Sequence, residues 1–241
     1  MYKSWPLEKL PPEFVRPELT QVMEKYKLSD PWEVVELFES QIAEYAGSEY
    51  AVAVDNCTDA LFLCLKYYLY EKLGSRDINR IYKFDSIYIP KRTYISVPQT
   101  IIQAGFNVQF EDLKWDGYYY LKPLNIIDSA ARFTKNMYVG SDVLQCLSFQ
   151  IKKRLPIGKG GMILTNDIKA AKWLRKARYE GRDIKKPYTE DKIKFLGWNM
   201  YMCPEDAARG VQLFEMLGHN SEWPDCMDFN HYTDLTEQGI F

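Results

Sequence analysis

The stretch "LSFQIKKRLPIGKGGMILTND" (residues 147–167) decides the fold prediction, because two apolar runs flank a basic turn that is rich in glycine. The apolar runs predict one strand over residues 146–150 and another over residues 161–167. Three lysines and one arginine lie between them, although the whole chain carries a net charge of only −2. The turn is therefore either a solvated basic loop or the local site of a phosphate-bearing ligand held by one of its lysines.

Short apolar runs alternate with amphipathic segments in both directions from this stretch. Further strands are predicted at residues 50–54, 86–90, 108–112 and 125–128, and helices at 32–46, from about 57 to Gly74, at 96–105, around Ala171, Leu174 and Ala177, and around Ala207, Val211 and Phe214. Strands that alternate with helices of about 10 to 15 residues indicate an α/β sheet with helices on both faces. We expect a three-layer sandwich with a mostly parallel sheet, which binds its ligand at the carboxyl ends of the strands.

The composition argues against several classes of protein. The 241 residues are 46% hydrophobic, which is enough for a substantial core. Thirty-one Lys and Arg against 33 Asp and Glu leave no positive field that would attract nucleic acid or an anionic membrane. Five cysteines without CxxC spacing and only two histidines indicate reduced thiols and no metal site. No apolar run reaches the roughly 18 to 20 residues of a membrane helix and no signal peptide is visible, so we expect a cytoplasmic protein.

The chain divides into three parts by composition. Residues 1–30 are rich in proline and charge and read as an N-terminal arm that packs on another part of the protein. Residues 31–217 contain all the predicted strands and form the α/β domain. Residues 218–241 are polar and aperiodic, so we expect a C-terminal tail that is loose or docked on a partner.

Side chains able to bind a ligand follow three of the predicted strands. Asn56, Cys57 and Thr58 begin a helix, whose free N–H groups suit a phosphate, although an ordinary capped helix explains the same residues. Asp128 either caps a loop or faces a cationic ring nitrogen. Tyr94 either belongs to the core or offers a ring face to a planar ligand. Each of these signals is weak when it is considered alone.

Residues 147–167 add the groups that connect these signals. Ser148 and Lys153 lie five residues apart across the end of a strand, and Gly158, Gly160 and Gly161 allow the backbone to approach closely. A phosphate site, a carboxylate for a pyridinium nitrogen, an aromatic ring and an amine that can form a Schiff base together describe one ligand. The predicted cofactor is pyridoxal 5'-phosphate, bound by the domain of residues 31–217.

Six blocks, in order over about residues 30–217, resemble the DegT/DnrJ/EryC1/StrS family of pyridoxal-phosphate sugar aminotransferases. The blocks are "FESQIAEYAGSEYAVAVDNCTDAL", "YIPKRTYISVPQTIIQAGFNVQFEDL", "IIDSAARF", "LSFQIKKRLPIGKGGMILTND", "RKARYEGR" and "FLGWNMYMCPEDAARGVQLFEML". The resemblance implies fold type I, with a large domain like that of aspartate aminotransferase. It also implies that the C-terminal small domain of the family is largely missing from this shortened chain.

The resemblance assigns roles residue by residue. Lys153, rather than Lys152, would be the catalytic Schiff-base lysine, because the glycines of the family motif fall into step only with that register. The other roles are phosphate binding by Ser148 and Thr58, contact with the ring nitrogen by Asp128, stacking on the ring by Tyr94, and contact with the cofactor phosphate of a second subunit by Asn199. Asn56, Cys57 and Ala131 complete the expected set of cofactor-binding residues.

Several residues depart from the family pattern. Cys57 stands where the family has glycine, Ala131 where it has Gln or His, Lys159 where it has glutamate, and Tyr201 where it has arginine. Only 13 residues separate Asp112 from Ile126, whereas the family has a further helix and strand there. Substrate recognition is therefore the part of the function that the resemblance defines least.

The resemblance implies transfer of an amino group, from glutamate, to a keto sugar on a nucleotide. The alternative is a non-catalytic homologue or interaction protein that keeps the cofactor site. A dehydratase is disfavoured, because dehydratases of the family have histidine in place of the Schiff-base lysine. A homodimer with shared sites is expected, because Trp198, Tyr201 and Met202 of the loop "GWNMYM" would otherwise face water.

Overall fold

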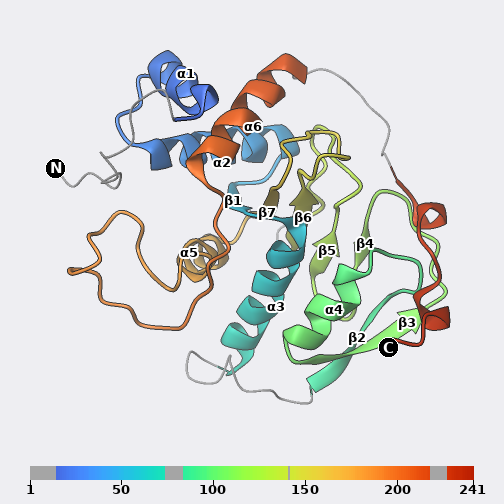
Figure 1. Ribbon diagram of the computed structural model, residues 1–241. Coiled ribbons are helices and arrows are strands. Elements are labelled where there is room, and N and C mark those ends of the chain that lie inside the picture. The colour runs from blue at the N-terminus through green and yellow to red at the C-terminus, as the bar shows by residue number, and fades with distance from the viewer. Residues whose placement is uncertain (1–14, 74–83, 141, 218–226) are drawn as a thin grey trace.

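The computed structural model describes residues 15–73, 84–140, 142–217 and 227–241 (Figure 1). The helices and strands are α1 Pro17–Tyr26, α2 Pro31–Ala46, β1 Tyr50–Val54, α3 Cys57–Leu73, β2 Phe84–Pro90, α4 Ser96–Gln103, β3 Phe106–Glu111, β4 Tyr119–Tyr120, β5 Ile126–Asp128, β6 Leu144–Ser148, β7 Gly161–Thr165, α5 Ile168–Ala177, α6 Pro204–Leu217, and the 3-10 helices η2 Phe229–His231 and η3 Leu235–Glu237. The predicted α/β class is confirmed, although β4 was not predicted. Among the described helices, none combines the length and apolar content that crossing a membrane requires.

The main sheet has the strand order β1-β7-β6-β5-β4, and β2 and β3 form a separate parallel pair. Within the main sheet, β5 and β6 pair in parallel, whereas β7 is antiparallel to both of its neighbours and β4 is antiparallel to β5. The expectation of a mostly parallel sheet therefore needs correction. Because β7 follows β6 through one loop, it runs back along β6 and separates that strand from β1.

Helices cover both faces of the main sheet, as the three-layer prediction requires. Figure 1 shows α1, α2 and α6 on one side of the strands and α3 and α4 on the other. The alternation along β1 explains the two cores, because Ala51 and Ala53 pack with α2 and α6 while Val52 and Val54 pack with α3 and α5. The sheet thus holds the ends of β1, β5 and β6 in fixed positions beneath these helices.

The start of α3 is fixed by Asn56 rather than by Thr58. The Asn56 side-chain oxygen accepts a hydrogen bond from the backbone N–H of Asp59 at 2.9 Å, which is the usual N-cap arrangement. The Thr58 hydroxyl instead forms a 2.7 Å hydrogen bond with the hydroxyl of Ser96. The expected helix end at Gly74 lies outside the described residues.

The N-terminal segment is more regular than the predicted arm, of which residues 1–14 lie outside the described chain. Helix α1 packs against α2 and α6, and its Leu19 and Val22 are buried in their core. The described segment therefore contributes to the main domain. The boundaries of the three predicted parts remain a prediction.

The loop "GWNMYM" does not expose its large apolar side chains, so the sequence argument for an interface at this loop was wrong. The Trp198 ring lies 5.2 Å from that of Phe62, the Tyr201 ring lies 5.4 Å from that of Trp32, and Met202 is buried. These contacts come from residues more than 130 positions away in the chain, which a reading of local periodicity does not detect.

The first residue of β7 approaches the first turn of α3 very closely. A Cβ atom at Gly161 would lie 2.5 Å from the carbonyl carbon of Asn56 and 2.7 Å from the backbone nitrogen of Cys57. Backbone atoms cannot move aside as a flexible side chain can, so only glycine permits this contact. The contact holds the loop between β6 and β7 against the start of α3.

We predict that Gly161→Ala destabilises the protein by about 1–3 kcal/mol, because the added methyl group forces the two backbones apart. Gly140→Ala is the matched control, since a Cβ at Gly140 meets nothing within 4 Å. The measurement is the free energy of unfolding in urea. Equal effects of the two substitutions would contradict the importance of this contact.

Candidate active site

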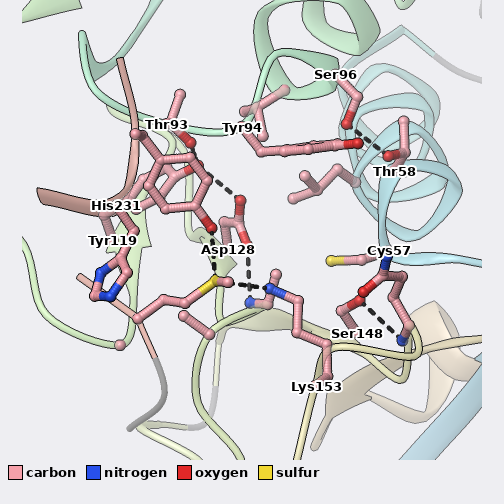
Figure 2. Close-up of a pocket in the computed structure, with 18 of the residues that line it drawn as sticks. Cys57, Thr58, Thr93, Tyr94, Ser96, Tyr119, Asp128, Ser148, Lys153 and His231 are labelled. Carbon is pink, nitrogen blue, oxygen red and sulfur yellow. Dashed lines mark hydrogen bonds between the residues drawn. The ribbon is translucent and has the colours of Figure 1, made fainter. Parts of the chain in front are cut away.

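A cavity of about 480 Å³ opens where the carboxyl ends of β1, β5 and β6 meet the starts of α3 and α4 (Figure 2). Eight of the nine predicted site residues line it: Asn56, Cys57, Thr58, Tyr94, Asp128, Ala131, Ser148 and Lys153. They come from four segments that are far apart in the sequence. The structure thus brings together the residues that the strand ends suggested, at the edge of the sheet where they were expected.

Asp128 lies at the centre of the cavity in Figure 2 and is almost completely buried. Its Oδ2 accepts a 2.6 Å hydrogen bond from the Tyr119 hydroxyl, and its Oδ1 accepts one of 2.9 Å from the backbone N–H of Ala130. Burial raises the pKa of this carboxyl, whereas the two hydrogen bonds and the positive charge of Lys153 act in the opposite direction. Asp128 therefore caps the turn at Ala130 through its Oδ1, and its buried carboxyl also lines the cavity, where it can contact a ligand.

The Lys153 side chain enters the cavity from the loop between β6 and β7 (Figure 2). Its Nζ lies 3.5 Å from the Sδ of Met227, a weak acceptor. Its backbone N–H donates to the carbonyl of Gln150 at 2.7 Å, and Gly158 has a φ of +125°, which favours glycine. The left-handed backbone at Gly158 thus gives the loop a tight turn on the C-terminal side of Lys153. Lys152 also lines the cavity.

The first turn of α3 forms one side of the cavity together with Ser148. The N–H groups of Cys57 and Thr58 lie in this turn, where helical N–H groups lack a carbonyl partner within the helix. Hydroxyl groups of Thr58, Ser96 and Ser148 line the same side. Such a combination of a helix N-terminus and hydroxyl groups suits a phosphate.

Two side chains complete the surroundings of this space. The Tyr94 side chain is 61% exposed, and Figure 2 shows its ring across the cavity from Lys153. Ala131 is buried and contributes only a methyl group to the wall. The ring is therefore available to a planar ligand, and the wall beside Ala131 offers such a ligand no hydrogen bond from that side chain.

Lys159 and Asn199 lie outside this cavity lining. Lys159, which replaces a glutamate of the family motif, forms a 2.9 Å ion pair with Asp55 next to the start of α3. Asn199 is exposed and its side-chain amide donates a hydrogen bond to Glu180. A contact of Asn199 with the cofactor of a second subunit therefore remains a prediction.

One wall of the cavity comes from the C-terminal segment, whose sequence gives no signal of a binding site. Residues 218–226 lie outside the described chain, but Met227, His231 and Tyr232 line the cavity. The backbone N–H of Gly117 donates to the carbonyl of Met227 and that of Phe229 to the carbonyl of Trp115, both at 3.2 Å. The expectation of a loose or partner-docked tail is corrected, because residues 227–241 dock on their own chain.

An ion pair anchors this segment beyond the cavity. Lys91 Nζ lies 3.0 Å from Asp234 Oδ2 and 3.3 Å from Asp112 Oδ1, and the side chain of Asp234 is 6% exposed whereas that of Asp112 is 85% exposed. Hydrogen bonds from Thr236 and Lys91 lower the pKa of Asp234 to about 2. Since this pKa is depressed, the contribution of Asp234 to the stability of the folded protein is complete above a pH of about 4. It is lost as the pH falls through about 2.

We predict that Asp234→Asn increases amide hydrogen exchange over residues 227–235 several-fold at neutral pH, because Lys91 loses its buried partner. Asp112→Asn is the matched control, since it removes the exposed partner of the same lysine. Exchange is measured by mass spectrometry of peptic peptides. Similar exchange in both variants would contradict the role of Asp234 as the anchor.

Comparison with known proteins places the chain in a family. The model of the DegT/DnrJ/EryC1/StrS aminotransferase family matches residues 12–137 and 124–222. Among curated proteins, a sequence search finds no match.

Solved structures share the fold at low sequence identity. Helicobacter pylori PseC, an aminotransferase involved in the biosynthesis of pseudoaminic acid, is 17% identical, with a TM-score of 0.62 over 83% of this chain and 63% of that one. S. venezuelae DesV is 20% identical, with a TM-score of 0.61 over 83% and 61%. The GDP-4-keto-6-deoxymannose-3-dehydratase ColD is 18% identical, with a TM-score of 0.61 over 83% and 65%. The chain thus spans less than two thirds of the length of these structures, and the family match shows that it belongs to the DegT/DnrJ/EryC1/StrS aminotransferase family.

Proposed function

We propose that this chain binds pyridoxal 5'-phosphate in the cavity and transfers an amino group to a keto sugar. The observation that carries this proposal is the meeting of an amine, a buried carboxylate, a helix N-terminus and an aromatic ring in one cavity. These groups fit the cofactor, because its aldehyde, its ring nitrogen, its phosphate and its ring face each have a matching group in the cavity. Family membership supports the same conclusion.

Each of these groups has a defined task in the proposed site. Thr58, Ser148 and the first-turn N–H groups of α3 bind the phosphate. The carboxylate of Asp128 binds a protonated ring nitrogen, and each of the two charges favours the other. The Tyr94 ring stacks on the cofactor ring and limits its tilting. Asn56, Cys57 and Ala131 shape the remaining contact surface.

Lys153 has two tasks in this proposal. Pyridoxal phosphate, when bound, supplies an aldehyde that condenses with amines and a ring that withdraws electrons. The amine of Lys153 would hold the cofactor and would be free to act as a base once an amino donor takes its place. The free amine would then accept a proton from the α-carbon of the donor and hold it on Nζ, as a general base that contributes about 100-fold or more to the rate.

The substrates that we propose are glutamate as the amino donor and a nucleotide-linked keto sugar as the acceptor. The name of ColD, a structure of similar fold, includes a GDP-linked keto sugar, and PseC is an aminotransferase involved in the biosynthesis of pseudoaminic acid. Trp115 and Tyr232, whose ring centroids lie 5.6 Å apart, give the cavity an aromatic wall on which a sugar or a base could pack.

A cofactor-binding protein without turnover is the second candidate. The contact between Met227 and the amine of Lys153 favours it, because Met227 lies beside the position at which an amino donor would attack a cofactor held by that amine. The two candidates differ in one measurable property. An aminotransferase converts bound cofactor to its amino form when glutamate is added, whereas a binding protein keeps its spectrum.

We also propose that the working unit is a homodimer with shared sites. Apolar side chains on the connection between α5 and α6 support an interface there, since Tyr188 and Leu196 are each 68% exposed and Ile193 is 48% exposed. Asn199 lies on the same connection and is exposed. A two-fold contact through this surface would present each Asn199 to the neighbouring subunit.

The first test of the proposed function is borohydride reduction of protein incubated with pyridoxal phosphate. We predict that the reduced cofactor, which serves as a covalent label, is found on Lys153 and that Lys153→Arg is not labelled. Lys152→Arg, the matched control on the adjacent residue, retains the label and the glutamate half-reaction. Addition of keto nucleotide sugars then measures the second half-reaction. A label on Lys152 would refute the assignment of Lys153, and a site that never binds the cofactor would refute the function.

The second test mixes two inactive variants. Lys153→Ala and Asn199→Asp subunits, when combined, should restore about a quarter of wild-type turnover, because half of the dimers are mixed and each contains one intact site. Turnover is measured after brief denaturation and refolding of the mixture, with each variant alone as the control. A monomer in light scattering, or a mixture as inactive as its parents, would contradict the shared site.

A further inference from the structure

A short chain of hydroxyl groups leads to the central carboxylate of the cavity. The Tyr119 hydroxyl donates to Asp128 Oδ2 at 2.6 Å, so its oxygen is free to accept the hydrogen bond that links it to the Thr93 hydroxyl. Because each hydroxyl has one proton, Thr93 must be the donor in that second bond. The order is therefore Thr93 to Tyr119 to Asp128, and all three side chains are buried.

The connection between β3 and β5 explains why Tyr119 stands at this place. Tyr119 lies on the two-residue strand β4 and is the direct cross-strand partner of Asp128 on β5. The ring of Trp115 packs on it, with a centroid distance of 5.0 Å, and the Trp115 indole N–H donates to the carbonyl of Arg92 at 2.8 Å. These contacts leave the Tyr119 hydroxyl little freedom to turn away from the carboxylate.

Titratable groups on four parts of the chain face Asp128. They are Tyr119 on β4, Lys153 on the loop after β6, and the thiols of Cys57 on α3 and Cys146 on β6. Burial and the negative charge of Asp128 raise the pKa values of Tyr119 and Cys57, so both remain protonated at neutral pH. Among these neighbours, Tyr119 donates a hydrogen bond directly to the carboxylate.

We propose that Tyr119 is a positioning residue for Asp128, whose hydroxyl, itself held by Thr93, fixes the carboxylate in the cavity in its ionised form. This inference rests on the proposed function for its consequence, which is that Asp128 then meets the ring nitrogen of the cofactor as a fixed negative charge. A charged acceptor gains more from such a bond than a neutral one, so the hydroxyl favours the ionised carboxyl.

The experiment measures Asp128 first in the protein without cofactor. Aspartate labelled with ¹³C at the carboxyl group is titrated by NMR, and the signal of Asp128 is identified by its loss in Asp128→Asn. Tyr119→Phe should raise the pKa of Asp128, because the ionised form loses its donor, and Thr93→Val should raise it less. Tyr120→Phe is the matched control, since Tyr120 is the adjacent residue on β4, lies on the opposite face and does not line the cavity.

The second measurement uses pyridoxal 5'-phosphate as the probe. Tyr119→Phe should weaken its binding at pH 6 about tenfold, because the raised pKa leaves Asp128 more protonated there, with a smaller loss at pH 8, whereas Tyr120→Phe should bind as the wild type does. An unchanged Asp128 titration in Tyr119→Phe overturns the inference, and so does a raised pKa together with unchanged cofactor affinity. Failure of the wild-type protein to bind the cofactor refutes the proposed function instead, and the titration then still decides whether Tyr119 controls the carboxylate.

Discussion

The backbone contact between Gly161 and the first turn of α3 is the constraint on which the candidate site depends. It lets β7 lie between β6 and β1, so that the loop before β7 returns beside the start of α3. Lys153 lies on that loop, and the expected phosphate-binding groups lie in the first turn of α3. The distance between the amine and the phosphate site is thus determined by two backbones in contact, which is a stiffer arrangement than side-chain packing.

The sequence predicted the parts of the fold and site that depend on local pattern. The apolar run of β1 followed by Asn56 and Thr58 has a helix-start signal, and Asp128 and Ser148 follow recognisable strand ends, so their places at one edge of the sheet follow from the α/β architecture. The sequence alone does not decide between Asn56 and Thr58 as the helix cap, because either residue type forms caps.

Features that depend on distant partners could not be predicted in this way. An apolar run such as "GMIL" looks the same whichever way the strand runs. The antiparallel direction of β7 could therefore not be predicted from it. Tyr119 acquires its relation to Asp128 only through pairing of a two-residue strand, which is too short to give a pattern. Met227 and Tyr232 belong to a polar, aperiodic segment, whose place is set by backbone hydrogen bonds near Trp115 and by the Arg92 side chain, which donates to the carbonyl of Tyr232.

Burial, aided by the charge of Asp128, keeps a second potential nucleophile in the cavity, the thiol of Cys57, in its protonated form. Cys57 stands where the family motif has glycine, and its thiol lies in the same cavity. Burial and the negative charge of Asp128 raise the pKa of this thiol well above its usual value. Because the thiolate is the reactive form of cysteine, Cys57 stays inert while Asp128 is ionised.

The wall formed by Met227, His231 and Tyr232 has a consequence for the order in which the protein is made. Met227 follows Lys153 by 74 positions, and the other segments around the cavity precede both. At a synthesis rate of about 5–20 residues per second, a nascent chain exposes Lys153 for several seconds before this wall is translated. The cavity is open on that side during this interval, because the segment that forms this wall has not yet been made.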